Sequence, residues 1–249
     1  MKQSIPDIVK SLTSISLSDM EDVALMKRTD TKFVIHENQL ISVLNAVKNA
    51  YHVLEIDGKR IMRYSSLYFD TANKKFYNDH HNGKVNRTKI RMRKYVDSDI
   101  CFLEIKQKDG KGSTTKTRIS IDDFEQDLSE NSIGFINETT NSDFNLEPII
   151  WNNFKRITLV NKVAKERLTI DLNLVFNKSG SFKSYNNLVI IEVKQERFSR
   201  SSPVVQQLKL KQINPYSISK YCIGMLSLYN DLKYNRFKKK LIRINKITA

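Results

Sequence analysis

Basic side chains recur at every second position in several short segments of this chain, and that spacing suits the binding of phosphate. In the segment Arg87-Thr88-Lys89-Ile90-Arg91-Met92-Arg93, four basic side chains share one face of an extended strand, whereas Ile90 and Met92 share the other. A guanidinium binds two phosphate oxygens through its planar fork, and an ammonium supplies a compact positive charge. The chemistry that this segment predicts is recognition of a phosphate polyanion.

Four further segments alternate in the same way, which is typical of strands. Their polar faces carry Glu104, Lys106 and Lys108; Lys116, Arg118 and Ser120; Arg167, Thr169, Asp171 and Asn173; and Glu192, Lys194 and Glu196. Each strand taken alone is explained by a solvated polar face over a core. Together they favour another geometry, because so many like charges on adjacent strands repel one another unless an anion lies between them. We therefore predict an α+β, β-rich fold, an antiparallel β-barrel of about eight strands with charges inside and helices packed outside.

The overall charge agrees with an anionic partner. Among 249 residues, 42 Lys and Arg stand against 27 Asp and Glu, which gives a formal net charge of +15. A folded protein with this charge needs counterions or an anionic partner, and nucleic acid, anionic lipid, nucleotide and inorganic polyphosphate are all suitable anions. No recognisable RNA-binding or DNA-binding motif accompanies the charge, so we expect no nucleic-acid partner.

Cysteine usage and hydropathy predict a cytoplasmic protein. The two cysteines, Cys101 and Cys222, have a spacing that matches neither a zinc knuckle nor a disulfide framework. The N-terminus lacks the apolar core of a signal peptide, and no apolar run approaches the roughly 20 residues of a membrane helix. The basic stretch 233–249 is expected to be a solvated helix or a frayed end. Its alternative roles are peripheral binding to the inner face of a membrane and guidance of an emerging polymer.

The chain is predicted to form a single domain over residues 1–249, with its core at about 27–232 and the basic tail at 233–249, because glycine and proline are few and no linker divides it. Helices are predicted at Asn38–Ala50, from Pro203 onward, after a Ser219 cap, and across 122–131. His80 and His81 are expected in a loop, where nothing spaced like a metal ligand surrounds them.

Six motifs carry a resemblance to a known family. In chain order they are Arg63-Tyr64-Ser65-Ser66-Leu67-Tyr68-Phe69-Asp70, Lys89-Ile90-Arg91-Met92-Arg93, Phe102-Leu103-Glu104-Ile105-Lys106, Arg167-Leu168-Thr169-Ile170-Asp171, Glu192-Val193-Lys194 and Ser219-Lys220-Tyr221. This ordered set resembles the catalytic domain of the VTC polyphosphate polymerases, which are triphosphate tunnel metalloenzymes. The similarity extends from about Lys27 to Gly224, nearly the whole chain.

The resemblance implies a fold, an activity and a set of site residues. It implies a β-barrel tunnel whose basic lining grips a phosphate chain, and a metal-dependent phosphotransferase that moves the γ-phosphate of ATP onto inorganic polyphosphate. Carried over by position, the residues implied at the reaction centre are Arg91, Arg93, Lys106, Arg156 and Lys220. The other phosphate ligands implied or added as candidates are Lys32, Arg63, Lys89, Lys116, Arg118, Arg167 and Lys194. Glu192 corresponds to the ligand of Mn²⁺ or Mg²⁺.

Two departures from the family pattern keep alternatives open. The superfamily motif Glu-x-Glu-x-Lys is replaced by Arg28-Thr29-Asp30-Thr31-Lys32, which argues against a carboxylate-rich, two-metal hydrolytic site. The polymerase motif Tyr-x-Arg is replaced by Phe154-Lys155-Arg156, which lacks a hydroxyl. The alternatives are a tunnel-family triphosphatase or nucleotide cyclase and a non-catalytic polyphosphate-binding module. ATP and polyphosphate are the expected partners, and a membrane-protein partner is an option that the sequence does not show.

Two glutamates also have structural interpretations. Glu104 is expected to order the basic residues around it rather than to bind metal. Glu192 has an alternative role as a salt-bridge partner of Lys194 or of a neighbouring arginine.

Overall fold

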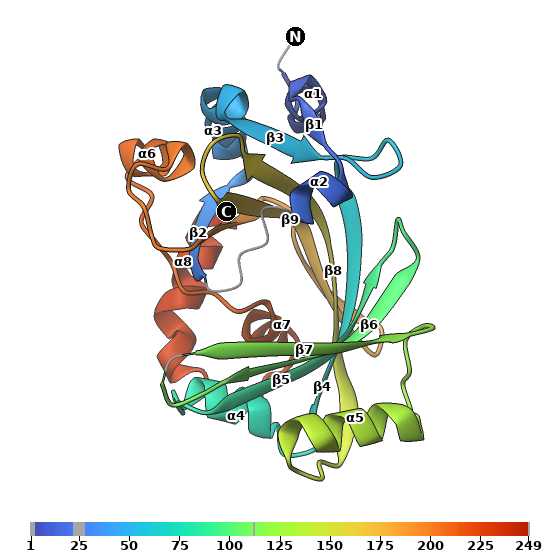
Figure 1. Ribbon diagram of the computed structural model, residues 1–249. Helices are drawn as coiled ribbons and strands as arrows, with labels where there is room; N and C mark the ends of the chain where they lie inside the picture. Colours follow the sequence, from blue (N-terminus) through green and yellow to red (C-terminus); the bar gives the residue numbers. More distant parts are fainter. Residues whose placement is uncertain (1–2, 22–27, 112, 249) are drawn as a thin grey trace.

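The alternating segments form the strands of one sheet in the computed structural model, which describes residues 3–21, 28–111 and 113–248 (Figure 1). The strands are β1 (Ser14–Ile15), β2 (Thr29–His36), β3 (Tyr51–Leu54), β4 (Met62–Thr71), β5 (Arg87–Tyr95), β6 (Ile100–Lys108), β7 (Thr114–Ile121), β8 (Leu146–Asn161), β9 (Glu166–Lys178), β10 (Ser181–Tyr185) and β11 (Leu188–Gln195). Lys27, where the core is predicted to begin, lies outside the described residues.

The sheet curves around an interior without closing on itself. Its main path runs in the order β2-β11-β9-β8-β4-β5-β6-β7, and every pairing along this path is antiparallel. β2 and β7 end the path, and within the described residues they do not pair with each other. Figure 1 shows β5, β6 and β7 facing the half of the sheet that holds β2 and β9. The β-rich, eight-strand arrangement agrees with the sequence prediction, and the barrel that it forms is open.

The helices lie outside the sheet or across its open side. They are α1 (Ile5–Ser11), α2 (Leu17–Glu21), α3 (Glu37–Val47), α4 (Lys75–His81), α5 (Glu130–Thr140), α6 (Pro203–Leu210), α7 (Lys220–Leu228) and α8 (Lys238–Thr248), with 3₁₀ turns at Lys48–Ala50 and Asn235–Phe237. The predictions of α3, α6 and α7 are confirmed. Pro203 begins α6, and the Ser219 hydroxyl caps α7 by accepting the amide of Cys222 at 3.4 Å.

The predicted helix across 122–131 is wrong. The helix in this part of the chain, α5, begins at Glu130, because the Ser129 hydroxyl accepts the amide of Ser132 at 3.3 Å and caps its first turn. Phe124 and Leu128 lie in the preceding non-helical segment and pack against the hydrophobic cluster formed with β5 and β6.

The placement of His80 and His81 in a loop is also wrong, because both belong to the last turn of α4. The buried carboxylate of Asp70 accepts the backbone amides of Phe76 at 2.8 Å and Tyr77 at 3.0 Å. These bonds satisfy amides in the first turn of α4 that have no partner within the helix. The helix is therefore fixed by an aspartate earlier in the chain.

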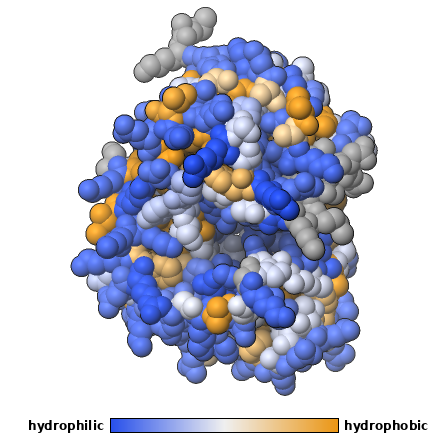
Figure 2. Space-filling view, turned by 60° about the vertical axis from the view of Figure 1, so that its left-hand side comes forward, coloured by the Kyte–Doolittle hydropathy of each residue, from blue (hydrophilic) through white to orange (hydrophobic). Residues whose placement is uncertain are grey.

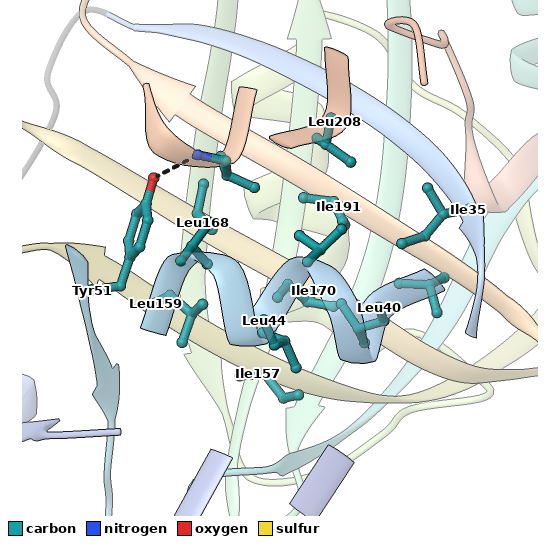
Figure 3. Close-up of a cluster of buried hydrophobic side chains, with 14 of the residues drawn as sticks. Ile35, Leu40, Leu44, Tyr51, Ile157, Leu159, Leu168, Ile170, Ile191 and Leu208 are labelled. Atoms are coloured by element: carbon teal, nitrogen blue, oxygen red, sulfur yellow. Dashed lines mark hydrogen bonds between the residues drawn. The ribbon is translucent and has the colours of Figure 1, made fainter. Parts of the chain in front are cut away.

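The largest hydrophobic core lies on the outer face of the sheet, under α1, α3 and α6. Figure 3 shows Leu40 and Leu44 of α3 against side chains from β8, β9 and β11, among them Ile157, Ile170 and Ile191. All five of these side chains are at most 1% exposed. The apolar faces of these strands thus point outward beneath helices, as the alternation predicts.

One helix packs inside the sheet, which the sequence analysis did not predict. α7 contacts β8, β9 and β10, and its residues join a second hydrophobic cluster with Phe176. The close approach requires glycine at position 224, because a Cβ there would lie 2.4 Å from Phe176 Cδ1 and 2.8 Å from Ile150 Cδ1. α7 fills one end of the interior, so its N-terminal residues Ser219 and Lys220 reach the remaining space.

The tail at 233–249 was predicted to be a solvated helix or a frayed end. It does form a helix, α8, over Lys238–Thr248, but this helix is packed against the fold rather than fully solvated. α8 buries Ile244 completely, and Phe237, directly before α8, is 8% exposed. Both side chains belong to the cluster that holds α7. Among the described helices, none is both long enough and apolar enough to cross a membrane.

Candidate active site

A cavity of about 290 Å³ lies between the two halves of the sheet and the start of α7. The predicted site residues that line it are Lys32, Lys89, Arg91, Arg93, Lys106, Lys116, Arg156, Arg167, Glu192, Lys194 and Lys220. They come from β2, β5, β6, β7, β8, β9, β11 and α7, segments that are far apart in the sequence. Figure 2 shows a hollow on one face of the molecule, bordered mainly by hydrophilic residues. The polar faces predicted from the alternation therefore do meet in one enclosed space.

Arg63 and Arg118, also predicted as phosphate ligands, do not line this cavity. Arg63 alternates with Tyr64 on β4 and points the other way, where its Nη2 lies 2.9 Å from Asp97 Oδ1. Arg118 is exposed, and its guanidinium lies 4.2 Å from the centre of the Phe102 ring. The alternation places Arg118 on the same face of β7 as Lys116, but its guanidinium lies over Phe102 rather than in the cavity lining.

Glu104 lies between two basic residues on neighbouring strands. Its carboxylate forms an ion pair with Arg91 at 2.6 Å and another with Lys116, and its side chain is 1% exposed. Burial by itself would raise the pKa of Glu104, but the adjacent cations, Arg91 foremost, lower it well below its usual value. The predicted role of Glu104 in ordering basic residues fits this geometry.

Asp171 plays the same part on the opposite wall. Its Oδ1 lies 2.6 Å from Arg156 Nε, its Oδ2 lies 2.9 Å from Arg156 Nη2, and it also pairs with Lys220. Burial alone would raise the pKa of Asp171, but Arg156 and Lys220 lower it far below the usual value. The sequence analysis placed Asp171 on a polar strand face without assigning it to the site. Its position four residues after Arg167, on the same face of β9, was the available signal.

Glu192 is the third carboxylate shared by two cations. It lies 3.0 Å from Lys32 Nζ and 2.9 Å from Lys194 Nζ, and the strand register places it between Lys32 and Thr169. Burial would raise its pKa, but Lys194 and Lys32 lower it well below the usual value. Burial in turn lowers the pKa of Lys194 to about 8, although Glu192 opposes that shift.

Four basic residues of the lining make no ion pair within the described part of the chain. They are Lys89, Arg93, Lys106 and Arg167. Lys89 donates to the Ser219 hydroxyl at 3.1 Å, and Arg93 donates to the Ser66 hydroxyl at 3.1 Å. The buried Nε of Arg167 has no hydrogen-bond partner among the residues that the structure describes. Arg93 is 6% exposed, and a buried charge is costly without a counter-charge, so this group of donors favours an anion in the cavity.

The lining suits a divalent cation only together with a phosphate ligand. The described residues contain no group of three His, Cys, Asp or Glu side chains placed to hold a metal ion. Glu192 has one acidic neighbour in the lining, Asp30, which lies diagonally across from it on β2. Mg²⁺ is commonly held by one or two carboxylates plus substrate phosphates, and Glu192 with Asp30 meets that pattern. To bind a metal ion, the Glu192 carboxylate would have to give up its ion pair with Lys32 or Lys194.

The sequence and the fold of this chain resemble those of known proteins. The model of the VTC domain family matches residues 27–229, which contain every residue of the cavity. No curated protein matches the chain. Among solved structures, a candidate adenylate cyclase from Vibrio parahaemolyticus is 11% identical, with a TM-score of 0.47, over 81% of this chain and 99% of that chain. A candidate adenylyl cyclase from Hippeastrum, described as having a dominant triphosphatase activity, is 16% identical, with a TM-score of 0.49, over 81% of this chain and 96% of that one. The extent of the family match shows that the chain belongs to the VTC domain family.

Proposed function

We propose that this protein is an ATP-dependent polyphosphate polymerase. The supporting observation is a set of four basic residues that have no acidic partner among the described residues. They lie in one cavity beside three carboxylates that each hold two cations. Such a lining presents free donors to phosphate oxygens while it keeps the other cations in fixed positions. Membership of the VTC domain family supports the choice of ATP and inorganic polyphosphate as the partners.

The reaction needs positioning and charge neutralisation more than covalent help from the protein. The ionised terminal phosphate of the acceptor chain attacks the γ-phosphorus of ATP. The bond between that phosphorus and the β,γ-bridging oxygen breaks, and ADP leaves with the electron pair. Arg91, Arg93, Lys106, Arg156 and Lys220 are the residues proposed to hold the triphosphate in line and to balance the charge on its oxygens. No side chain is needed as a general base, because the attacking oxygen is already ionised.

Glu192 is the proposed protein ligand of Mn²⁺ or Mg²⁺, which when bound would neutralise charge on the phosphate oxygens. Lys32 and Lys194 pair with Glu192 in the described structure. If Glu192 held the metal, these two ammonium groups would be available for phosphate. In this proposal, the state of the Glu192 carboxylate determines whether Lys32 and Lys194 are paired with it or are available to bind phosphate.

Hydrolysis of a triphosphate is the second candidate, because Asp30 joins Glu192 in the lining. Two carboxylates are what a hydrolytic tunnel site would use to hold metal. However, Asp30 is engaged by Arg28, with a distance of 2.9 Å between Arg28 Nε and Asp30 Oδ1. We therefore rank hydrolysis below polymer synthesis.

The deciding experiment is incubation of the purified protein with ATP and Mn²⁺, with products resolved on a gel and by nucleotide chromatography. Polymerase activity predicts acid-insoluble polymer and one ADP for each phosphate added. Free phosphate would identify a triphosphatase, and cyclic nucleotide would identify a cyclase. Metal-independent binding of polyphosphate without turnover would identify a binding module. Any of these last three results without polymer would refute the proposal.

A further inference from the structure

The C-terminal segment 233–248 is strongly basic and carries no Asp or Glu. Its basic residues are Lys233, Arg236, Lys238, Lys239, Lys240, Arg243 and Lys246. A helix of this composition would normally be fully solvated, yet α8 packs through the buried Ile244 and contacts β2 and β11. The fold thus holds a row of cations in a fixed position near two strands of the cavity wall.

α8 is tied to the cavity wall through Tyr216. The Arg243 guanidinium lies 4.8 Å from the centre of the Tyr216 ring, and the Tyr216 amide donates to the carbonyl of Lys32 at 2.6 Å. Lys240 precedes Arg243 by three residues, so the two side chains are neighbours on one helix face. Figure 1 shows α8 beside β2, on the same side of the molecule as α4. One face of α8 therefore leads from the Lys32 region of the wall toward α4.

The ends of β5 and β6 carry two more cations just outside the cavity. Arg87 and Lys108 are directly opposite each other in the strand register, and Lys89 and Lys106, one pair further along, line the cavity. Neither Arg87 nor Lys108 forms an ion pair with a carboxylate in the described ranges. The basic row of the interior therefore continues past the cavity lining.

His80 lies where these elements meet. Its Nδ1 is buried and has no hydrogen-bond partner among the described residues. Burial first, and then four nearby cations, lower the pKa of His80 to about 3. Those cations are Lys89, Arg87, Lys240 and Lys108. The His80 ring stacks on Phe237 with 5.8 Å between the ring centres, and Lys240 Nζ lies 5.7 Å from the centre of the same Phe237 ring. Because α4, which carries His80, also packs against β5, His80 lies between the start of α8 and β5, among cations.

We propose that Arg87, Lys108, Lys240 and Arg243 form an outer binding site for the part of a phosphate chain that extends beyond the cavity. This inference rests on the proposed function. These four cations have no acidic partner in the part of the chain that the structure describes, so they repel one another. A polyanion that passes from Lys89 and Lys106 onto them would relieve that repulsion. A ligand as short as tripolyphosphate would be held by the cavity and would not need the outer site.

The test compares affinities for tripolyphosphate and for long-chain polyphosphate. Two independent variants remove the outer charges, R87Q/K108Q on the strands and K240Q/R243Q on α8. The control, K209Q/K211Q, removes the same charge from two exposed lysines at the end of α6, which packs against α3. We expect each outer-site variant to bind the long chain about tenfold more weakly, with a shallower dependence on salt. Tripolyphosphate binding should match that of wild type, which also shows that the variants are folded.

Three results would overturn the outer site. The first is that both variants bind long-chain polyphosphate with wild-type affinity. The second is that the variants lose affinity for tripolyphosphate and for long-chain polyphosphate to the same extent. The third is loss of sedimentation with phosphatidylserine-containing vesicles by K240Q/R243Q while its long-chain binding stays intact, which would assign α8 to a membrane surface. The polymerase proposal is judged separately. If wild type forms polymer but the variants bind the long chain normally, only the outer site fails; if the variants lose long-chain affinity but wild type forms no polymer, only the polymerase assignment fails.

Discussion

Arg156 and Asp171 face each other across β8 and β9 and form a bidentate ion pair, with atom separations of 2.6 and 2.9 Å. Because Lys220 pairs with the same carboxylate, Asp171 joins the sheet to the first turn of α7. The pair therefore fixes two cations that belong to elements distant in the sequence. A phosphate entering the cavity meets cations that are already oriented.

Replacement of Arg93 should show whether polymer synthesis depends on basic residues inside the cavity or only on the overall positive charge of the protein. Arg93 is 6% exposed and makes no ion pair within the described residues, so its guanidinium is free for phosphate. We expect Arg93→Ala to lower the rate of ATP-dependent polymer synthesis by about 100-fold or more, the effect of losing one preorganised donor. Arg63→Ala is the control, because it removes the same group outside the cavity. Equal activity of the two variants in a gel-based synthesis assay would contradict the site assignment.

Asp171→Asn should destabilise the free protein more than the ligand complex. Loss of the carboxylate leaves Arg156 and Lys220 without a counter-charge, which costs about 3–5 kcal/mol for a buried pair. Phosphate oxygens can replace the carboxylate, so tripolyphosphate should raise the melting temperature of Asp171→Asn by more than that of wild type. Differential scanning fluorimetry with and without tripolyphosphate measures both shifts. Equal shifts would show that the ligand does not reach these two cations.

Lys194 should make phosphate affinity depend on pH above neutrality. Burial lowers its pKa in the free protein to about 8, whereas a bound phosphate favours the charged ammonium and so raises that pKa. Above pH 8 Lys194 is mostly neutral in the free protein, so phosphate binding takes up a proton. The titration of Lys194 should therefore lower the affinity for phosphate about tenfold by pH 9. Lys194→Arg keeps its charge and should show a smaller decline between pH 7 and 9. Calorimetry in buffers of different ionisation enthalpy would detect the proton uptake, and parallel pH profiles for the two proteins would exclude this role for Lys194.

Gly224→Ala should test the packing of α7 inside the sheet. The added methyl group would lie 2.4 Å from Phe176 Cδ1, so overpacking should lower the free energy of unfolding by about 1–3 kcal/mol. The matched control is Gly134→Ala in α5, where the new Cβ would meet nothing within 4 Å beyond its chain neighbours and the backbone of its own helix, among the described residues. There we expect stabilisation of about 0.5–1 kcal/mol, because alanine favours helix. Urea unfolding of both variants measures the difference, and a stabilising Gly224→Ala would mean that α7 does not approach β9 this closely.

The period-two alternation predicted five of the strands that carry the site, β5, β6, β7, β9 and β11, whereas Lys32 on β2 and Arg156 on β8 were identified only through the family resemblance. Arg91 and Arg93 on β5, and Glu192 and Lys194 on β11, lie on the inner face as expected, because successive side chains of a strand point to opposite faces. The helical periodicity of α3 and the caps of α6 and α7 were equally local signals. The prediction of a helix across 122–131 was wrong because Phe124 and Leu128 pack against β5 and β6 from a non-helical segment, and not from one face of a helix.

The amino-acid sequence by itself determined which residues share a strand face, the helices α3, α6 and α7 and, through ordered motifs, which family the chain belongs to. Only the tertiary structure decided which strands are neighbours, and with them which cations each carboxylate holds. Asp171 contacts Lys220 although 49 positions separate them, and Arg63 lies outside the cavity although its residue type suits phosphate. The physical reason is that backbone geometry is set by adjacent residues, whereas pairing of charges depends on strand register and on the curvature of the whole sheet.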